Sequence, residues 1–395
     1  MSGPLTGVRV LELGTLIAGP FCGKTLGDFG AEVIKIEPPG EGDPLRRWRR
    51  MRNGTSLWWH VQSRNKKSIT LDLRKPEGQA VVRRLVESAD IMVENFRPGA
   101  LERWNLGWDV LSKVNPKLVL VRISGYGQSG PYRERPGFAA IAEAFGGLRH
   151  VTGYPDRAPV RPNLSVGDSI ASLHGVIGAL LGLLQAKNSG VGQVIDVSLF
   201  ESVFNLTESM MPEYDAEGLV RERSGSSLPG IAPSNAYPCK DGALVLIAAN
   251  ADSLFKRLMT AVGREDLRDD PALARNEGRA AQMARIDEAI GAWTAQRSQQ
   301  DVLAAMQAAE VPAGTIYTIA DIAADPHYTA REAIVQVTAG DGAPLRMPGV
   351  FPVLSATPGA IRHAAPALGE HTDEVLRAAG YSDAELAELH AKGIV

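Results

Sequence analysis

The stretch VRVLELGTLIAGPFCGKTLGDFGAEVIKI (residues 8–36) decides the fold. Residues 8–13 are rich in Val and Leu and predict a strand, and Ala18-Gly19-Pro20 predicts a turn that leads into a helix near residues 21–29. Residues 32–36 predict a second short strand. A strand, a helix and a second strand in this order are typical of a parallel α/β sheet.

The same alternation continues along the first half of the chain. Pro76 suits the first turn of a helix, where its missing N–H is not needed. Further strands are predicted at residues 68–73, 91–94, 118–124 and 194–198, and further helices at residues 76–88, 168–187 and 202–210. We therefore predict the α/β class, with ligands bound at the carboxyl ends of the strands.

The character of the sequence changes at residues 217–233, which are rich in Gly, Ser and Pro and predict a linker or flexible loop. Beyond it, residues 253–310 are mainly helical in pattern and more highly charged. Short strands are predicted at residues 242–248, 311–318 and 334–337, and terminal helices near residues 372–379 and 383–392. We expect a large domain with its N-terminal part at residues 1–215, a smaller α+β domain at residues 225–325, and a C-terminal part at residues 326–395 that returns to the large domain.

The composition excludes several classes of function. The 395 residues carry 42 basic and 45 acidic side chains, interleaved to a net charge of −3, so we expect no nucleic-acid or membrane partner. The two cysteines, Cys22 and Cys239, form no metal-ligand pattern, so we expect no metal. Residues 1–7 lack the features of a secretory signal, and we expect the reducing cytoplasm. The most apolar run, at residues 176–184, is too short to span a bilayer.

A formal dinucleotide motif occurs at residues 125–130, which read GYGQSG after a predicted strand. Such a motif must also open a helix, because the pyrophosphate rests on the helix N-terminus. Here Pro131 follows at once, and Pro136 and Gly137 come soon after. We interpret the motif as a Gly-rich loop that shapes a site, and not as a nicotinamide-binding turn.

Asp168, in NLSVGDS (residues 163–169), precedes a helix of small residues. An Asp at or near a helix N-cap ordinarily accepts backbone N–H bonds. The same position favours the carboxylate form, which can attack an acyl centre and form a covalent intermediate. His174 lies on another face of the helix and His371 precedes a C-terminal helix, so both are ordinarily structural. The pattern alone leaves both interpretations of Asp168 open.

Several long segments, in order, resemble the class III CoA-transferases, the family of formyl-CoA:oxalate, carnitine and succinate–hydroxymethylglutarate CoA-transferases. The matching segments are LTGVRVLEL (5–13), AGP (18–20), GDFGAEVIKIE (27–37), GEGD (40–43), RNKKSI (64–69), VENFRPG (93–99) and LGEHTDEVL (368–376). The resemblance implies a Rossmann-like large domain with a smaller domain. It also implies two chains interlocked as a homodimer.

The resemblance makes Asp168 the nucleophile, which would form first an aspartyl–acyl anhydride and then an aspartyl-CoA thioester. Coenzyme A and acyl-CoA are then substrates, and no prosthetic group is needed. The positions that match the family's CoA contacts are Thr15, Leu16, Ile17, Leu73, Arg74, Asn95 and Arg103, with Phe138 at the same site. The two arginines suit the nucleotide phosphates, because a guanidinium binds phosphate in a bidentate manner.

The chain also departs from the family pattern. Formyl-CoA transferase has His and Gln where this chain has Thr15 and Ile17, and a basic residue where it has Pro38. It has Tyr-Glu where this chain has Phe138-Ala139, so an acidic partner is missing. Its tetraglycine lid has no direct equivalent, and residues 224–230 (SGSSLPG) are the expected counterpart. Oxalate is therefore not the expected acceptor.

Two alternatives stay open. The related α-methylacyl-CoA racemases place their catalytic His where this chain has Phe138, which cannot take a proton. A non-catalytic acyl-CoA-binding protein, or one subunit of a heteromeric system, would have no need of the Gly167-Asp168 step. We expect a transferase that moves CoA from a donor such as succinyl-CoA to a C4–C6 dicarboxylate resembling glutarate, itaconate or citramalate.

Overall fold

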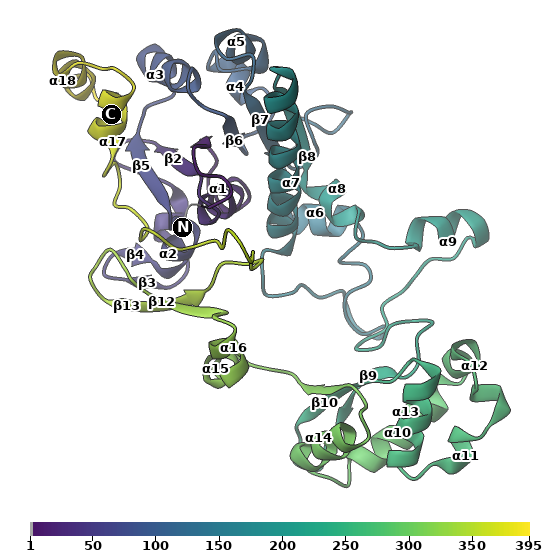
Figure 1. The fold of residues 1–395 in the computed structure, drawn as a ribbon. Helices are drawn as coiled ribbons and strands as arrows, with labels where there is room; N and C mark the ends of the chain where they lie inside the picture. Colours follow the sequence, from purple (N-terminus) through teal and green to yellow (C-terminus); the bar gives the residue numbers. More distant parts are fainter. Residues whose placement is uncertain (1–2) are drawn as a thin grey trace. The chain divides into compact units, whose positions relative to one another are not determined.

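The computed structural model describes residues 3–395, and these form two compact units (Figure 1). Unit 1 contains residues 3–148, 162–212 and 326–395, and unit 2 contains residues 149–161 and 213–325. Residues 149–161 therefore pack with unit 2, although the sequence analysis placed them in the large domain. The first two residues of the expected large domain lie outside the described part of the chain.

Unit 1 is built around a six-stranded sheet in which every strand pair is parallel, in the order β5-β2-β1-β6-β7-β8. The strands are β1 (Arg9–Glu12), β2 (Glu32–Glu37), β5 (Lys66–Thr70), β6 (Ile91–Glu94), β7 (Val119–Ser124) and β8 (Gln193–Ser198). Counted within the sheet alone, this order is 3-2-1-4-5-6, that of the doubly wound nucleotide-binding fold. The order reverses between β1 and β6, and ligands of such sheets bind in the crevice at that point.

Helices cover both faces of the sheet, so its strands are apolar on both sides. In β1, Val10 faces a cluster with α1 (Ala18–Asp28) and α7 (Val166–Ser189), while Leu11 faces the opposite cluster. That opposite layer contains α3 (Pro76–Val86), α4 (Ala100–Arg103), α5 (Trp108–Val114), α17 (Thr372–Ala378) and α18 (Asp383–Ala391). The C-terminal helices thus complete the layer begun by α3, as Figure 1 shows.

Helix α7 packs closely on β7 and β8 because glycines line its inner side. A Cβ at Gly178 would meet Ile195, and one at Gly182 would meet Val119. By length and composition α7 is apolar enough to cross a membrane, although the core helices of soluble proteins share that composition. Its outer side exposes Leu173, Ile177, Leu180, Leu181 and Leu184.

Shorter elements complete unit 1. They are η1 (Pro44–Arg47), the hairpin of β3 (Met51–Arg52) and β4 (Thr55–Ser56), α2 (Leu57–Gln62), α6 (Ala139–Phe145), α8 (Leu199–Phe204), α16 (Pro326–Ala330), and the hairpin of β12 (Ile334–Thr338) and β13 (Pro344–Pro348). Helix α9 (Met210–Glu217) crosses the boundary between the units. The two hairpins are joined by an ion pair between Arg52 and Asp341, 3.0 Å apart.

Unit 2 has a three-stranded antiparallel sheet and its own core. The strands are β9 (Ser234–Pro238), β10 (Leu244–Ala248) and β11 (Ala313–Thr315), and the helical elements are α10 (Asp252–Ala261), α11 (Glu265–Arg268), η2 (Pro271–Leu273), α12 (Asn276–Ala281), α13 (Met283–Thr294), α14 (Gln299–Ala308) and α15 (Ile319–Ala324). In β10, Val245 and Ile247 are buried against the helices while Leu244 and Leu246 are exposed. This alternation is typical of a sheet covered on one face.

The structure corrects several local predictions. Residues 18–20 are the first turn of α1 and not a turn before it, because Pro20 is tolerated there. The single helix predicted at residues 202–210 is instead the end of α8, a turn, and the start of α9. The antiparallel strand β9 and the β3–β4 hairpin were not predicted, because two-residue strands and mixed polar strands lack a clear period of two.

Candidate active site

At the switch point between β1 and β6, the turn at residues 14–17 meets Asn95, which follows β6. The Asn95 side chain accepts a hydrogen bond from the Thr15 backbone N–H, at 2.7 Å, and donates one to the Thr15 carbonyl oxygen, at 2.9 Å. Gly14 and Gly19 allow this approach, because a Cβ on either would lie within 3.3 Å of the Asn95 amide oxygen. Two segments predicted to contact CoA therefore meet at the switch point of the sheet.

Leu16 has a left-handed backbone, with φ of +64°, which is uncommon for a residue other than glycine. Its N–H donates to both carboxylate oxygens of Asp43, at 3.0 and 3.2 Å. Its side chain packs against a small cluster that includes Leu45 and Trp59. Ile17 is buried, so any ligand contact at this position is through its backbone.

Asp43 belongs to a buried group of charges under the turn. The Lys35 ammonium lies 2.7 Å from Asp43 and 3.2 Å from Glu12, and it donates to the Gly14 carbonyl oxygen. Burial lowers the pKa of Lys35, but the charges of Asp43 and Glu12 outweigh burial and the pKa is raised. Lys66 lies 2.7 Å from Glu12, and burial lowers its pKa, because Glu12 compensates only in part and Lys35 repels it.

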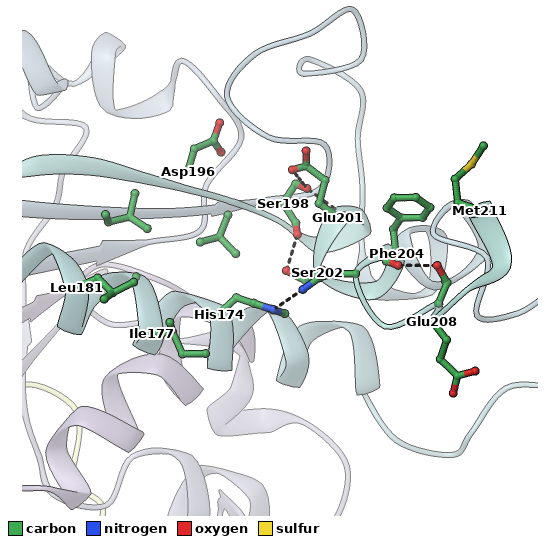
Figure 2. Close-up of a pocket in the computed structure, with 15 residues that line it drawn as sticks. His174, Ile177, Leu181, Asp196, Ser198, Glu201, Ser202, Phe204, Glu208 and Met211 are labelled. Atoms are coloured by element: carbon green, nitrogen blue, oxygen red, sulfur yellow. Dashed lines mark hydrogen bonds between the residues drawn. The ribbon is translucent and has the colours of Figure 1, made fainter. Parts of the chain in front are cut away.

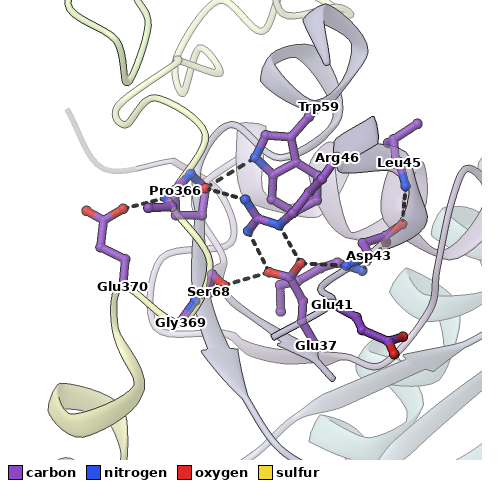
Figure 3. A network of polar contacts seen from close by, with 12 residues as sticks. Glu37, Glu41, Asp43, Leu45, Arg46, Trp59, Ser68, Pro366, Gly369 and Glu370 are labelled. Atoms are coloured by element: carbon purple, nitrogen blue, oxygen red, sulfur yellow. Dashed lines mark hydrogen bonds and ion pairs between the residues drawn. The ribbon is translucent and has the colours of Figure 1, made fainter. Parts of the chain in front are cut away.

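A second ion pair, between the half-buried Arg46 and the buried Glu37, lies beside Asp43, as Figure 3 shows. The Arg46 guanidinium binds the Glu37 carboxylate in a bidentate manner, with both N–O distances at 2.8 Å, and stacks on Trp59. Glu37 also accepts the Asp43 N–H, at 2.9 Å. The loop that carries Asp43 is thereby fixed to β2.

Asp168 is the third helical residue of α7 and not its cap, because Ser165 is the N-cap residue. Asp168 is half-buried. Ser172, one turn later, donates from its hydroxyl to the carbonyl oxygens of Asp168 and Ala18, at 2.6 and 2.8 Å. The first turn of α7 is therefore joined to the start of α1 at the switch-point turn.

The buried Glu143, on α6, lies beneath this turn. Its carboxylate accepts the Gly167 N–H at 3.3 Å, and a Cβ on Gly167 would lie 3.3 Å from the Glu143 Cγ. Ala139, where an acidic residue is missing from the family pattern, is buried at the start of the same helix. An acidic side chain is therefore present one helical turn after the expected position.

The other predicted contact residues are Leu73, Arg74, Arg103 and Phe138. Leu73 is half-buried and follows β5, and Arg74 is exposed and bound to Asp72 at 2.8 Å. Arg103 is exposed at the end of α4. Phe138 is 69% exposed at the start of α6. The carboxyl ends of β1, β5 and β6 lie along one edge of the parallel sheet, and Leu73 and Arg74 follow β5 at that edge, whereas Arg103 ends α4 and Phe138 precedes α6.

Glu94, next to Asn95, is buried in another charged group. Its carboxylate lies 2.7 Å from Arg122, which also binds Glu102. Burial raises the pKa of Glu94 to about 7, against the opposing effect of Arg122.

His174 and His371, the histidines considered in the sequence, both have structural contacts. His174 lies 3.1 Å from the Ile170 carbonyl oxygen and 3.5 Å from the Asn205 amide, and it lines a hollow of about 730 Å³ between α7 and α8 (Figure 2). Asp168 does not line this hollow. His371 occupies the N-cap position of α17 but makes no side-chain cap, since its ring accepts the Ser68 N–H at 3.3 Å. The motif at residues 125–130 lies in a loop, and the next helix begins only at Ala139.

Sequence reasoning gave no role to Lys35, Asp43 or Glu143. Asp43 ends the GEGD segment that contributed to the family resemblance, so a signal was present. Lys35 in EVIKIE would be solvated in a sheet with one exposed face, but both faces of this sheet are covered. Glu143 lies in a short helix that was not predicted.

The chain is similar to known proteins over nearly its whole length. The family model described as CoA-transferase family III matches residues 5–372. A succinyl-CoA–D-citramalate CoA-transferase of Chloroflexus aurantiacus is 50% identical, covering 99% of this chain and 98% of the relative. The beta subunit of a succinyl-CoA–L-malate CoA-transferase of the same organism is 44% identical, with the same coverage. The crystal structure of a CAIB/BAIF family protein from Brucella suis is 35% identical, with a TM-score of 0.83 over 96% of this chain and 100% of that one. This chain therefore belongs to CoA-transferase family III.

Proposed function

We propose that this enzyme moves CoA from succinyl-CoA to a hydroxylated or unsubstituted C4–C6 dicarboxylate, with citramalate and malate as the first candidates. The observation that carries the proposal is the 50% identity, over nearly all of both chains, with a transferase named for succinyl-CoA and D-citramalate. CoA-transferases use CoA thioesters as substrates, so no prosthetic group is required.

In the proposed mechanism Asp168 is the nucleophile. Its carboxylate attacks the thioester carbonyl carbon of succinyl-CoA, the carbon–sulfur bond breaks, and a mixed anhydride and CoA thiolate form. The thiolate then attacks the aspartyl carbonyl of the anhydride, which releases succinate and leaves an aspartyl-CoA thioester. The acceptor carboxylate attacks this thioester, and the thiolate attacks the acceptor's carbonyl in the new anhydride, which restores Asp168. Each step exchanges one activated acyl bond for another.

Several features support these roles. The N-terminus of a helix favours a negative charge, and Asp168 lies in the first turn of the 24-residue α7. The Ser172 hydroxyl joins the Asp168 carbonyl oxygen to that of Ala18, the residue that follows the turn proposed to bind CoA. Arg74 and Arg103 are both exposed, and we propose that they bind the nucleotide phosphates, Arg74 by exchanging its bond to Asp72 for a phosphate.

We also propose that two copies interlock as a homodimer in the cytoplasm. The exposed apolar side chains on the outer side of α7 support a covered surface there. We propose residues 224–230 as the active-site lid.

The test is an acceptor screen with purified protein and succinyl-CoA, read by mass spectrometry. The panel contains D-citramalate, L-malate, glutarate, itaconate and oxalate. We expect new acyl-CoA from at least one C4–C6 dicarboxylate and none from oxalate. The purified protein alone must carry out the exchange, since dependence on a second polypeptide would favour a subunit of a heteromeric system.

Asp168→Ala and Asp168→Asn test the nucleophile. We expect transfer to fall at least about 1000-fold, because without the nucleophile neither the aspartyl anhydride nor the aspartyl-CoA thioester can form. In the wild type, hydroxylamine should trap Asp168 as its hydroxamate. Retained transfer in Asp168→Ala would refute the mechanism. Solvent deuterium entering the α-carbon of a 2-methylacyl-CoA, without acid exchange, would instead identify a racemase.

A further inference from the structure

We propose that Asp43 is a positioning residue that fixes the turn at residues 14–17 in the shape that binds CoA. The inference rests on the proposed CoA site at this turn. Asp43 is fully buried, so it acts through the turn and not by touching the substrate.

Three buried or half-buried side chains hold three consecutive residues of the turn. Lys35 binds the Gly14 carbonyl oxygen, Asn95 binds both backbone groups of Thr15, and Asp43 binds the Leu16 N–H. These side chains come from β2, from the segment after β6 and from the loop before η1. The backbone of the turn is therefore fixed by groups that are distant in sequence.

Asp43 is the member that contacts both the turn and another member of the set, Lys35. One of its oxygens accepts the N–H groups of Leu16 and Leu45, and the other lies 2.7 Å from the Lys35 ammonium. The remaining charges that face this pair are Glu12, Glu37 and Lys66. Without the Asp43 charge, Lys35 would be drawn towards Glu12 and away from Gly14.

The Leu16 conformation explains why the turn needs these hydrogen bonds. A non-glycine residue with φ of +64° is disfavoured unless its surroundings hold it. The bond from the Leu16 N–H to Asp43 supplies that constraint, and the packing of the Leu16 side chain near Trp59 adds to it. When the bond is lost, the turn should relax to a commoner conformation, and the backbone that faces the crevice should move.

The test is Asp43→Asn in the full-length enzyme, which keeps the shape and one acceptor oxygen but removes the charge. We expect the KM for succinyl-CoA and the Kd for CoA to rise at least about tenfold. The kcat and the KM for the acceptor acid should stay within about threefold. A merely structural role would lower the amount of folded enzyme without this split.

The matched control is Asp28→Asn. Asp28 is also a buried carboxylate in unit 1, paired with the buried Arg64 at 2.7 Å, but it lies at the far end of α1. The Asp28→Asn variant should be less stable than the wild type but keep the wild-type KM for succinyl-CoA. An equal rise in KM in both variants, or a folded Asp43→Asn enzyme with an unchanged KM and Kd, would overturn the proposal.

If Asp43→Asn does not fold, the double variant Lys35→Met/Asp43→Leu replaces the whole pair by apolar groups of similar size, a change that buried ion pairs commonly tolerate. The same rise in Kd for CoA is expected, because the Leu16 N–H then has no acceptor and Met in place of Lys35 cannot bind the Gly14 carbonyl oxygen. The Kd for CoA also separates the two proposals. If the wild type binds CoA but transfers none, the proposed function is refuted. If these variants leave the Kd for CoA unchanged, the proposed positioning role of Asp43 is refuted.

Discussion

In the turn at residues 14–17 the backbone is held by buried side chains of the same unit, whereas the first turn of α7 lies at a partly open edge. The turn rests on Lys35 and Asp43, both fully buried. Near the start of α7, Leu164 is 68% exposed and Phe138 is 69% exposed. In the proposed mechanism the first region binds CoA, which every substrate shares, and the second performs chemistry on acids that differ. A fixed binding turn and a more open reaction site suit that division.

The largest effect on stability should come from breaking the buried network. Lys35→Met leaves Asp43 and Glu12 without their shared cation, and removing one partner of a buried pair costs about 3–5 kcal/mol. Urea denaturation should report this loss. Asp168→Asn is the contrasting variant, and we expect its free energy of unfolding to change by less than about 1 kcal/mol. A similar loss in both variants would remove the distinction between the two regions.

The network should also make unfolding sensitive to acid. Burial opposes ionisation of Glu37 and Asp43, but Arg46 and Lys35 outweigh it, and the pKa of each carboxyl is lowered below 4.5 and 3.8 respectively. A carboxyl with a lowered pKa stabilises the fold above its unfolded pKa, and this contribution is lost as pH falls. The urea midpoint should therefore fall as the pH drops below about 4.5, and less so in Asp43→Asn.

Glu94 should affect the pH dependence of stability in the opposite direction to Glu37 and Asp43, and at higher pH. Its pKa of about 7 is raised from 4.5, so the folded state takes up a proton before the unfolded state does. This contribution is present below pH 4.5 and is lost as the pH rises through about 7. Glu94→Gln should flatten the profile between these values. An unchanged profile would mean that the Arg122 pair keeps Glu94 ionised throughout.

The smallest effect should come from Phe138→Ala. Because this side chain is 69% exposed, we expect the free energy of unfolding to change by less than about 0.5 kcal/mol. Thermal unfolding checks this value, and the KM for the acceptor acid is measured alongside. A stability loss above about 1 kcal/mol would show that the Phe138 ring is buried in solution. The start of α7 would then be packed as closely as the turn at residues 14–17.

The sequence predicted the sheet but not all of its surroundings. Residues 91–94 and 118–124 matched β6 and β7 to within one residue, because buried parallel strands form continuous apolar runs. Helix α7 was predicted to within two residues at its ends, since its small and apolar residues leave no break before Gly190. The strand predicted at residues 334–337 matched β12 to within one residue, but β13 and several short helices of unit 1 were not predicted, because a few residues carry too little periodicity.

By itself the sequence determined the α/β class, the family, and the candidate residues on both sides of the crevice. Only the tertiary structure decided that β1 and β6 are neighbours with a reversal of order between them, and that Asn95 and Asp43 bind adjacent residues of one turn. It also placed Lys35 in the interior, although the EVIKIE pattern alone would leave it in water. The physical reason is that hydrophobic periodicity is a local property, whereas the pairing of buried charges depends on which distant segments share the same interior space.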